Sequence, residues 1–155
     1  GDSGGAESPL LYDTPEGWQP GDLKTMRKAA FQIEKEGQRA EVTVIDLARA
    51  GNDLQPNIDR WRGQVGLKPA TAEELTASLQ NIPTLGVEGQ MVALHGPADG
   101  ADNGKKPMSI LGVYAVVGEK VWFIKLQGDS SLAKAEQARF EQFVKSLKFR
   151  KAGGE

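Results

Sequence analysis

The sequence predicts a single α+β domain built on a mostly antiparallel β-sheet, and three observations support this fold class. The chain has 155 residues, 39% of them hydrophobic, which suits one globular domain with its own core. Segments with strand periodicity come in groups instead of alternating with helices, and an amphipathic segment closes the chain. We therefore expect the sheet to be flanked by two short helices and a long C-terminal helix, as an α/β/α sandwich.

The expected domain covers residues 10–150. Residues 1–9 are small, polar and rich in Gly and Ser, as flexible linkers are, and residues 151–155 read as a flexible tail. Such a start suits a chain trimmed behind a removed signal or a lipid-anchor cysteine, although a cloning boundary explains it equally well.

Two strands near the start are predicted to form a hairpin. Between residues 25 and 34, Ala29, Phe31 and Ile33 share one parity, the period-2 pattern of a half-buried strand. A turn at Gly37-Gln38 leads into the β-branched run 40–47. Before them we expect a short strand and a turn closed by an aromatic anchor, at Leu10–Tyr12 and Pro15–Trp18.

The period then changes to that of a helix. Ile58, Trp61 and Val65 recur at helical spacing, and Gly66 supplies the stop. The segment Thr71–Glu74 is a capping box, which predicts the start of a second short helix.

Strand character returns in the second half of the chain. We expect strand character from Ile82 through Leu94 and two central strands at 108–117 and 121–126, joined by a short turn at 118–120. The near-continuous hydrophobicity of the last two suggests that at least one of their faces is covered. A final helix from about Asp129–Ser131 to Leu147 would lay one apolar stripe on the sheet: Phe140, Phe143, Val144 and Leu147.

Composition excludes several classes of function. Nineteen Lys and Arg against 21 Asp and Glu leave a net charge of −2, so no general basic field favours nucleic acid or an anionic membrane. The absence of cysteine removes disulfides, thiolate nucleophiles and zinc–thiolate sites. No apolar run approaches the roughly 20 residues of a membrane span. Phosphate-binding glycine motifs are missing as well, so we expect no cofactor and no metal.

Recognition chemistry is concentrated in residues 57–64. On a helical wheel, Trp61 lies on the apolar stripe, Asn57, Arg60 and Gln64 form an adjoining arc, and Arg62 falls on the far flank. The two arginines then point in different directions, which disfavours an anion clamp that uses both. These five residues are the predicted binding residues, with the Arg60 side favoured.

Two interpretations of that helix stay open. In the first, Trp61 anchors the helix to the sheet while one arginine pairs with a sheet carboxylate or a helix-end carbonyl. In the second, Asn57, Arg60 and Gln64 stand on the rim of a groove that recognises a carboxylate, a phosphate or a peptide backbone.

His95, the only histidine, is the one residue that suggests catalysis. It ends a predicted strand, and it could act as a general base only with a nucleophile and an orienting acid nearby. The loop 99–104 looks acidic but breaks the order of a calcium loop, with Ile110 where the twelfth ligand should be. The basic residues near the C-terminus complement the end of a helix without needing a partner.

The order of elements resembles a known family. Pro15–Trp18 near the start, strands flanking short helices, and Val121–Phe123 followed by a helix ending in Phe140–Phe149 resemble the PsbP-like or Mog1-like α+β sandwich. The resemblance is closer still to uncharacterised bacterial exported proteins or lipoproteins. It implies non-enzymatic work, such as docking onto a membrane complex or a protein partner, and it transfers no functional residue.

Three functions follow as hypotheses. The first is an extracytoplasmic binding or assembly module in the periplasm or cell envelope, lipid-anchored in its precursor, whose partner is a protein or small ligand. Such a module would be a monomer or weak homodimer, without nucleic acid, and it would meet the membrane only through the anchor. The second is an unrecognised hydrolase or transferase that uses His95. The third is a purely structural accessory domain without a pocket.

Overall fold

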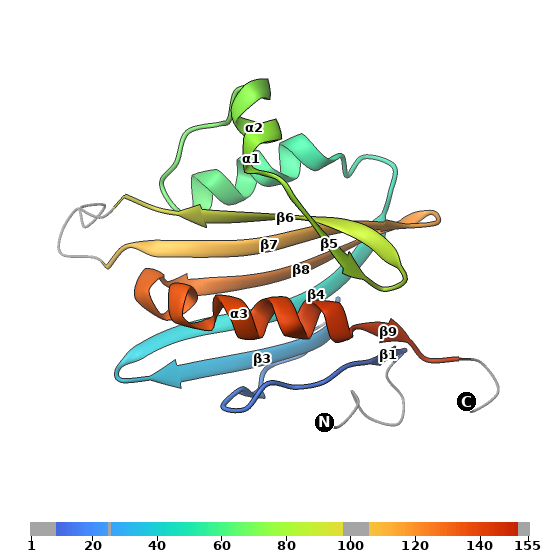
Figure 1. The fold of residues 1–155 in the computed structure, drawn as a ribbon, viewed down its shortest axis with the longest axis horizontal. Helices are drawn as coiled ribbons and strands as arrows, with labels where there is room; N and C mark the ends of the chain where they lie inside the picture. The colour runs from blue at the N-terminus through green and yellow to red at the C-terminus, as the bar shows by residue number, and fades with distance from the viewer. Residues whose placement is uncertain (1–8, 25, 98–105, 152–155) are drawn as a thin grey trace.

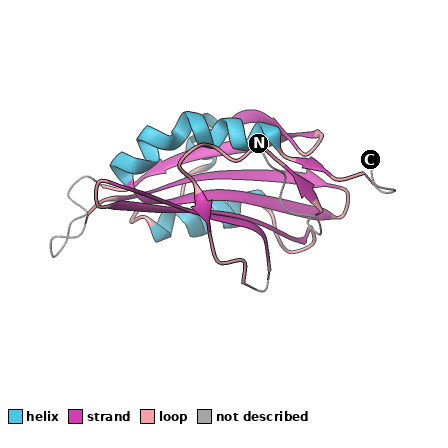
Figure 2. Cartoon of the chain, turned by 90° about the horizontal axis from the view of Figure 1, so that it is seen from below, coloured by secondary structure: helices cyan, strands magenta, loops and turns pink. Residues whose placement is uncertain are grey.

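A seven-stranded antiparallel sheet forms the middle layer of the domain, as the computed structural model shows for residues 9–24, 26–97 and 106–151. Figure 1 displays the sheet and Figure 2 shows helices on both of its sides. In spatial order the strands are β2 (Gln19–Pro20), β3 (Arg27–Lys35), β4 (Gln38–Ala48), β8 (Lys120–Asp129), β7 (Met108–Val117), β6 (Val87–His95) and β5 (Gln80–Thr84). The α+β class with a mostly antiparallel sheet is thus confirmed.

Three helices and a small strand pair complete the fold. Helices α1 (Leu54–Gln64) and α2 (Ala72–Ser78) lie on one face of the sheet, and α3 (Ser130–Ser146) lies on the other. Near the two ends of the domain, β1 (Leu10–Leu11) pairs with β9 (Lys148–Phe149), outside the main sheet.

The larger core lies between the sheet and α3. The predicted stripe of α3 is confirmed, because Phe140, Phe143, Val144 and Leu147 are all buried there. Trp18 packs its ring 5.2 Å from that of Phe143, which confirms the aromatic anchor expected after the first turn.

Most sequence-predicted elements occur where expected. The β3–β4 and β7–β8 hairpins form, and β7 and β8 are central strands with buried residues on both faces. The capping box is complete, since Glu74 N donates to Thr71 Oγ1 at 3.1 Å and Thr71 N donates to Glu74 Oε1 at 2.9 Å.

The strand character expected from Ile82 to Leu94 is confirmed, and the segment forms a hairpin whose turn the sequence did not indicate. Strands β5 and β6 pair around Leu85-Gly86, whose φ angles are +54° and +78°. A turn with two positive φ angles normally carries Asn or Asp in the first position, so Leu85 does not look like a turn residue. Tertiary contacts hold it there: its side chain is buried, and its N–H donates to the Leu147 carbonyl at 3.1 Å.

The start of α3 also differs from expectation. Asp129 occupies the N-cap position, but its carboxylate accepts the Arg39 backbone N–H at 2.9 Å and makes no cap hydrogen bond. The side chain therefore links the helix start to the β3–β4 hairpin.

Helix α1 is seated on the sheet by Trp61. The indole is 1% exposed and lies directly over Gly112 of β7, where a Cβ atom would overlap the ring. Its other neighbour is Phe123 of β8, with ring centroids 6.0 Å apart at 83°. A residue without a side chain in a central strand thus creates the seat for this helix.

Some expectations fall outside the described residues. The linker and tail at 1–8 and 152–155 and most of the acidic loop at 98–105 belong to this group. Among the helices of the described segments, none is both long and apolar enough to span a bilayer.

We predict that Gly112→Ala will destabilise the domain by ~1–3 kcal/mol, because the new methyl group must displace the Trp61 ring. Urea denaturation followed by tryptophan fluorescence measures the change. Gly63→Ala is the matched control: a Cβ at Gly63 of α1 meets nothing, so stability should hold or rise by up to ~1 kcal/mol. Equal stabilities of the Gly112→Ala variant and the parent would contradict the seating role of Trp61.

Candidate functional site

Half of the sheet face that carries α1 is not covered by a helix. The buried strand residues of the core beneath α1 come from β6, β7 and β8, and Ile45 and Leu47 near the end of β4 pack against it. Figure 1 places α1 and α2 beside β6, away from β3. Over β3 and β4 the same face carries polar side chains: Gln32, Glu34, Glu41 and Thr43. The sheet therefore leaves an open polar surface next to α1.

A cavity of about 230 Å³ lies where this open surface meets α1. It is called the cationic cavity below. Its lining residues come from β3 (Arg27), β4 (Glu41, Thr43 and Ile45), α1 (Arg60 and Trp61) and β8 (Phe123, Lys125 and Gln127).

Three cations but only one carboxylate line the cationic cavity. Glu41 is engaged by Arg27, whose two terminal nitrogens lie 3.0 and 3.4 Å from its oxygens. Arg27 also donates to the Asp22 carbonyl at 2.8 Å. Within the described segments, neither Arg60 nor Lys125 makes an ion pair. The cavity consequently has an excess of positive charge and unused donors.

Asn57 holds Arg60 in place. Its side chain is buried, donates to the Asp53 carbonyl at 2.7 Å and accepts a hydrogen bond from Arg60 NH1 at 2.7 Å. One of the five guanidinium N–H donors of Arg60 is thereby used, and the exposed remainder is free to bind a ligand. Asn57 is a positioning residue, because its buried amide links the helix start to the guanidinium of Arg60.

Lys125 occupies the floor of the cavity. Its half-buried amine lies 5.8 Å from the centre of the Trp61 ring and only 3.4 Å from Gln64 Oε1. Desolvation lowers the pKa of Lys125 first, and repulsion from Arg60 lowers it further. Attraction to Glu41 opposes these effects, and Arg27 adds a smaller repulsion. The ammonium ion is thus held in surroundings that disfavour its charge.

The structure separates the two arginines of α1. Arg62 points away from the cationic cavity and donates through Nε to the Lys68 carbonyl in the connection to α2. Of the five residues predicted from sequence, Arg60 and Trp61 line the cavity, Asn57 positions Arg60, and Gln64 contacts Lys125. The expectation that one arginine pairs with a backbone carbonyl near the helix end also describes Arg62.

Sequence reasoning missed the residues that the sheet contributes. Arg27, Glu41 and Lys125 come from three strands, and each has an ordinary exposed-face position in its own strand. Only the pairing of β4 with β8, which sets Thr43 opposite Lys125, brings these strands together. A charged residue inside the hydrophobic run 121–126 was the one local signal available.

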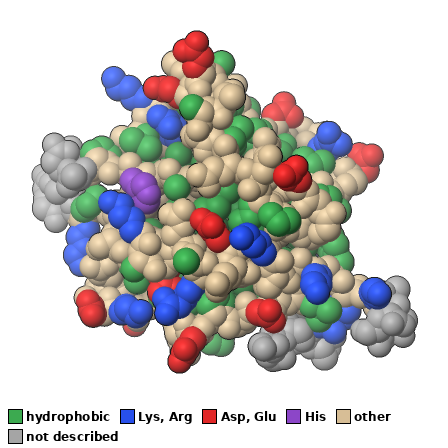
Figure 3. All heavy atoms as spheres, in the orientation of Figure 1, with side chains coloured by type: hydrophobic (Ala, Val, Ile, Leu, Met, Phe, Trp, Pro, Cys, Tyr) green, Lys and Arg blue, Asp and Glu red, His purple; other side chains and the backbone are tan. Residues whose placement is uncertain are grey.

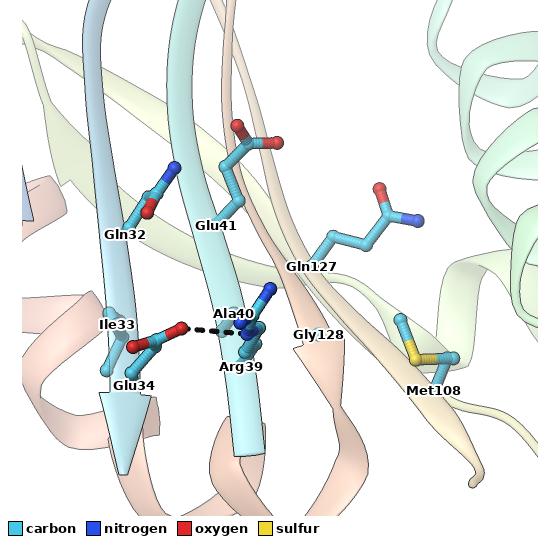
Figure 4. A pocket seen from close by; sticks show the side chains of 9 residues that line it. All are labelled: Gln32, Ile33, Glu34, Arg39, Ala40, Glu41, Met108, Gln127 and Gly128. Atoms are coloured by element: carbon cyan, nitrogen blue, oxygen red, sulfur yellow. Dashed lines mark ion pairs between the residues drawn. The ribbon is translucent and has the colours of Figure 1, made fainter. Parts of the chain in front are cut away.

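A second cavity of about 290 Å³ continues across the open surface. It shares Glu41 and Gln127 with the cationic cavity, and its other side chains carry little net charge because Arg39 pairs with Glu34 at 2.7 Å. Figure 4 shows Gln32, Glu41 and Gln127 projecting from neighbouring strands on the same side of the sheet. The two cavities therefore adjoin, with the unpaired cations at one end.

His95 belongs to a separate chain of hydrogen bonds. Its Nδ1 lies 2.7 Å from Ser109 Oγ, which lies 2.7 Å from Ser130 Oγ at the start of α3. In Figure 3 the imidazole, the single purple side chain, is visible at the surface with a cationic side chain beside it. Ser109 is fully buried, so a substrate cannot reach its hydroxyl. Within the described segments His95 makes no ion pair with a carboxylate, and this series of hydrogen bonds is best explained as a link between β6, β7 and α3.

The described residues contain no group of three or more His, Asp or Glu side chains placed to hold a metal ion. The acidic loop considered from the sequence is mostly outside these residues.

Comparison with known proteins supports the fold without naming a function. No protein-family model matches the chain, and no curated protein matches it. A solved structure from Bacteroides thetaiotaomicron superposes with a TM-score of 0.52 at 11% sequence identity. The match covers 94% of this chain and 46% of the other, so this chain spans about half the length of that protein. At this identity the likeness concerns the fold alone.

We predict that Lys125 will titrate below its ordinary pKa of 10.5, as measured by NMR of its side-chain carbon. Arg60→Gln should raise this pKa and Glu41→Gln should lower it further, because they remove a repulsion and an attraction. The unfolded chain binds the proton more tightly, so unfolding free energy should rise with pH between the folded value and 10.5. Lys125→Met should lose that slope. A Lys125 pKa at or above 10.5 would refute this account.

We predict that the single imidazole will titrate below 6.5, since burial and then repulsion from Lys134 lower the pKa of His95. Stability should therefore be complete above pH 6.5 and decline as the pH falls toward the folded-state value. Proton NMR of the only histidine reads the pKa directly. Lys134→Met should move it upward without touching the Ser109 hydrogen bond, and an unchanged value would exclude Lys134 as a cause.

Proposed function

We propose that this domain is a non-enzymatic binding module that recognises an anionic group, a carboxylate or a phosphate, on a protein or small-molecule ligand. The observation that carries the proposal is the cationic cavity, in which Arg27, Arg60 and Lys125 face one carboxylate. Arg27 and Glu41 satisfy each other. Arg60 and Lys125 are left as the donors for an incoming anion.

The electrostatics of the cavity favour this ligand class. Partial burial and the nearby Arg60 both disfavour the charged amine of Lys125, and within the described segments no ion pair offsets these effects. An anion between the two side chains would relieve their mutual repulsion and replace the water lost by Lys125. A guanidinium presents a planar fork that matches carboxylate and phosphate oxygens, and Asn57 fixes its position in advance.

The proposal also covers the fold family, the cellular location and the oligomeric state of the protein. We propose further that the fold is a PsbP-like or Mog1-like sandwich and that the protein acts outside the cytoplasm, with a lipid anchor in its precursor and a monomeric or weakly dimeric state. Resemblance to exported proteins supports these statements. Cell fractionation of the full gene product tests the location, and recovery in the soluble cytoplasmic fraction would contradict it.

The other two hypotheses have less support. A hydrolase using His95 would need an accessible nucleophile, whereas the hydroxyl beside this imidazole is on a fully buried residue, Ser109. A purely structural accessory domain would not need two adjoining cavities with unpaired cations at one end.

We predict that acetate and inorganic phosphate will shift the backbone NMR signals around Arg60 and Lys125. Arg60→Gln and Lys125→Met should each weaken binding about ten-fold, since one charged hydrogen bond contributes ~1.5 kcal/mol or more. Arg62→Gln is the matched control: it removes the same charge from the same helix but lies outside the cavity, so affinity should change less than about two-fold. Equal losses from Arg62→Gln and Arg60→Gln would mean that only the net charge matters and would refute the site.

A further inference from the structure

We propose that the connection between β2 and β3 docks this domain onto a membrane surface that contains anionic lipids, so that the anion received by the cationic cavity is a lipid headgroup phosphate. This inference rests on the proposed function, because it identifies the source of the anion. It adds a second contact, in which the side chains of Leu23 and Met26 enter the interface between headgroups and acyl chains.

Leu23 and Met26 are the most exposed large hydrophobic residues of the described segments. Their side chains lie in the same short connection and are 52% and 51% exposed. Isolated exposed leucines are common on protein surfaces, but two such residues close in sequence, with Lys24 between them, form a pattern typical of interfacial contact.

Local geometry presents this pair away from the body of the domain. Lys24 N donates to Asp22 Oδ1 at 3.3 Å, a short turn that puts Leu23 at its apex. Lys24 itself has a φ of +50°, which tightens the bend. Figure 2 shows the connection standing out from the sheet on the side opposite α3, where α1 and α2 lie. It is the part of this face that would reach a flat surface first.

The connection is tied to the cationic cavity. Arg27 NH1 donates to the Asp22 carbonyl at 2.8 Å, while the same guanidinium lines the cavity. A surface touched by Leu23 therefore comes close to the cavity that holds Arg60 and Lys125. Apolar contact and anion recognition are in this way adjacent on one face.

Charge in this region favours anionic lipids although the whole chain carries −2. Lys24 lies between the two apolar residues, and Arg60 and Lys125 lie in the adjoining cavity; within the described segments none of these three cations makes an ion pair. Lys28 is 3.9 Å from Asp46, which shares the strand face of Val42 and Val44 on the α3 side, so it is not counted with them. The acidic first turn of α2 lies on the same side of the sheet but near β6, so it would restrict docking to the β3 end. Such binding should be weak and sensitive to salt.

A lipid surface fits these features better than an acidic protein. Leu23 and Met26 are aliphatic and flexible, and neither lines the cationic cavity or the second cavity beside it. Insertion into an interface needs no such pocket, because burial of apolar area is not directional. An acidic protein partner is therefore treated as an outcome of the test.

A second exposed hydrophobic residue provides a matched control. Phe149 is 38% exposed and stands between Lys148 and Arg150, in equally basic surroundings. Its ring packs 5.4 Å from that of Trp122, a residue of the α3-side core, and its strand pairs with β1. Phe149 therefore belongs to another part of the molecule and is not expected to enter the membrane.

Vesicle sedimentation tests the proposal with the whole chain. Vesicles of equal parts phosphatidylglycerol and phosphatidylcholine should bind the protein at low salt, and vesicles of phosphatidylcholine alone should not. The double variant Leu23→Ser with Met26→Ser should weaken binding about ten-fold, as should Arg60→Gln, whereas Phe149→Ser should change it less than about two-fold. Circular dichroism checks that every variant is folded.

A parallel NMR titration with sn-glycerol 3-phosphate separates this inference from the proposed function. Binding of glycerol phosphate in the cavity without vesicle binding, or with vesicle binding that survives the loss of Leu23 and Met26, overturns the membrane proposal and leaves the anion site intact. Loss of vesicle binding in Phe149→Ser alone moves the contact to the C-terminal end and overturns it too. If neither glycerol phosphate nor acetate binds, the proposed function fails and the membrane proposal fails with it. Binding confined to acidic peptides also overturns the lipid assignment.

Discussion

The contact between the Trp61 ring and Gly112 is the constraint on which the rest of this structure depends. An indole is too large to lie flat against a strand that carries side chains, and Gly112 offers bare backbone in the middle of the sheet. Helix α1 is consequently fixed over β6, β7 and β8, where it closes the smaller core. Because α1 runs along these strands and not across the sheet, it does not shield β3 or most of β4. The same contact that completes one half of this face therefore leaves the other half open.

Helix α1 supplies part of the cationic cavity on the open half of this face. Arg60 is next to the anchoring tryptophan in sequence, so seating the ring also delivers the guanidinium to the edge of the sheet. Asn57, one turn earlier, is buried and uses both ends of its amide, one on the helix start and one on Arg60. The Trp61 ring lies beside the Lys125 amine, and the Arg60 guanidinium acts on the same amine electrostatically. The cationic cavity is thus a consequence of helix packing as much as of strand pairing.

How much of this could be predicted from the sequence depends on whether the signal is local. The helix with Trp61, the capping box at Thr71 and the stripe on α3 follow local periodicity and were predicted correctly. The hairpin at Leu85 was not, because a leucine with positive φ is held by contacts with α3 that no short window of sequence contains.

The division of roles between Arg60 and Arg62 followed from helical geometry. Arg27 and Lys125 could not be assigned to the same site, because they are about a hundred residues apart and meet only through the order β3-β4-β8. The close contact at Gly112 could have been predicted from the sequence, since a glycine inside a strand often marks the close approach of another group.

The unfavourable electrostatics at Lys125 bear on the function of the cationic cavity. Folded proteins usually satisfy a half-buried charge with a partner, and this chain does so elsewhere: the buried Glu136 accepts from Trp18 Nε1 at 2.9 Å and faces Arg139 at 3.2 Å. At Lys125 the carboxylate that favours the charged amine, Glu41, is already engaged by Arg27, and the larger electrostatic effect on its pKa comes from a cation, Arg60. Arg60 and Lys125 repel each other, and the hydrogen bond to Asn57 holds Arg60 in place, so ion pairing within the described segments does not explain why both cations are present. Local violations of packing and charge rules concentrate at functional sites, where a ligand supplies what the fold leaves out. The proposed anion would be that ligand here.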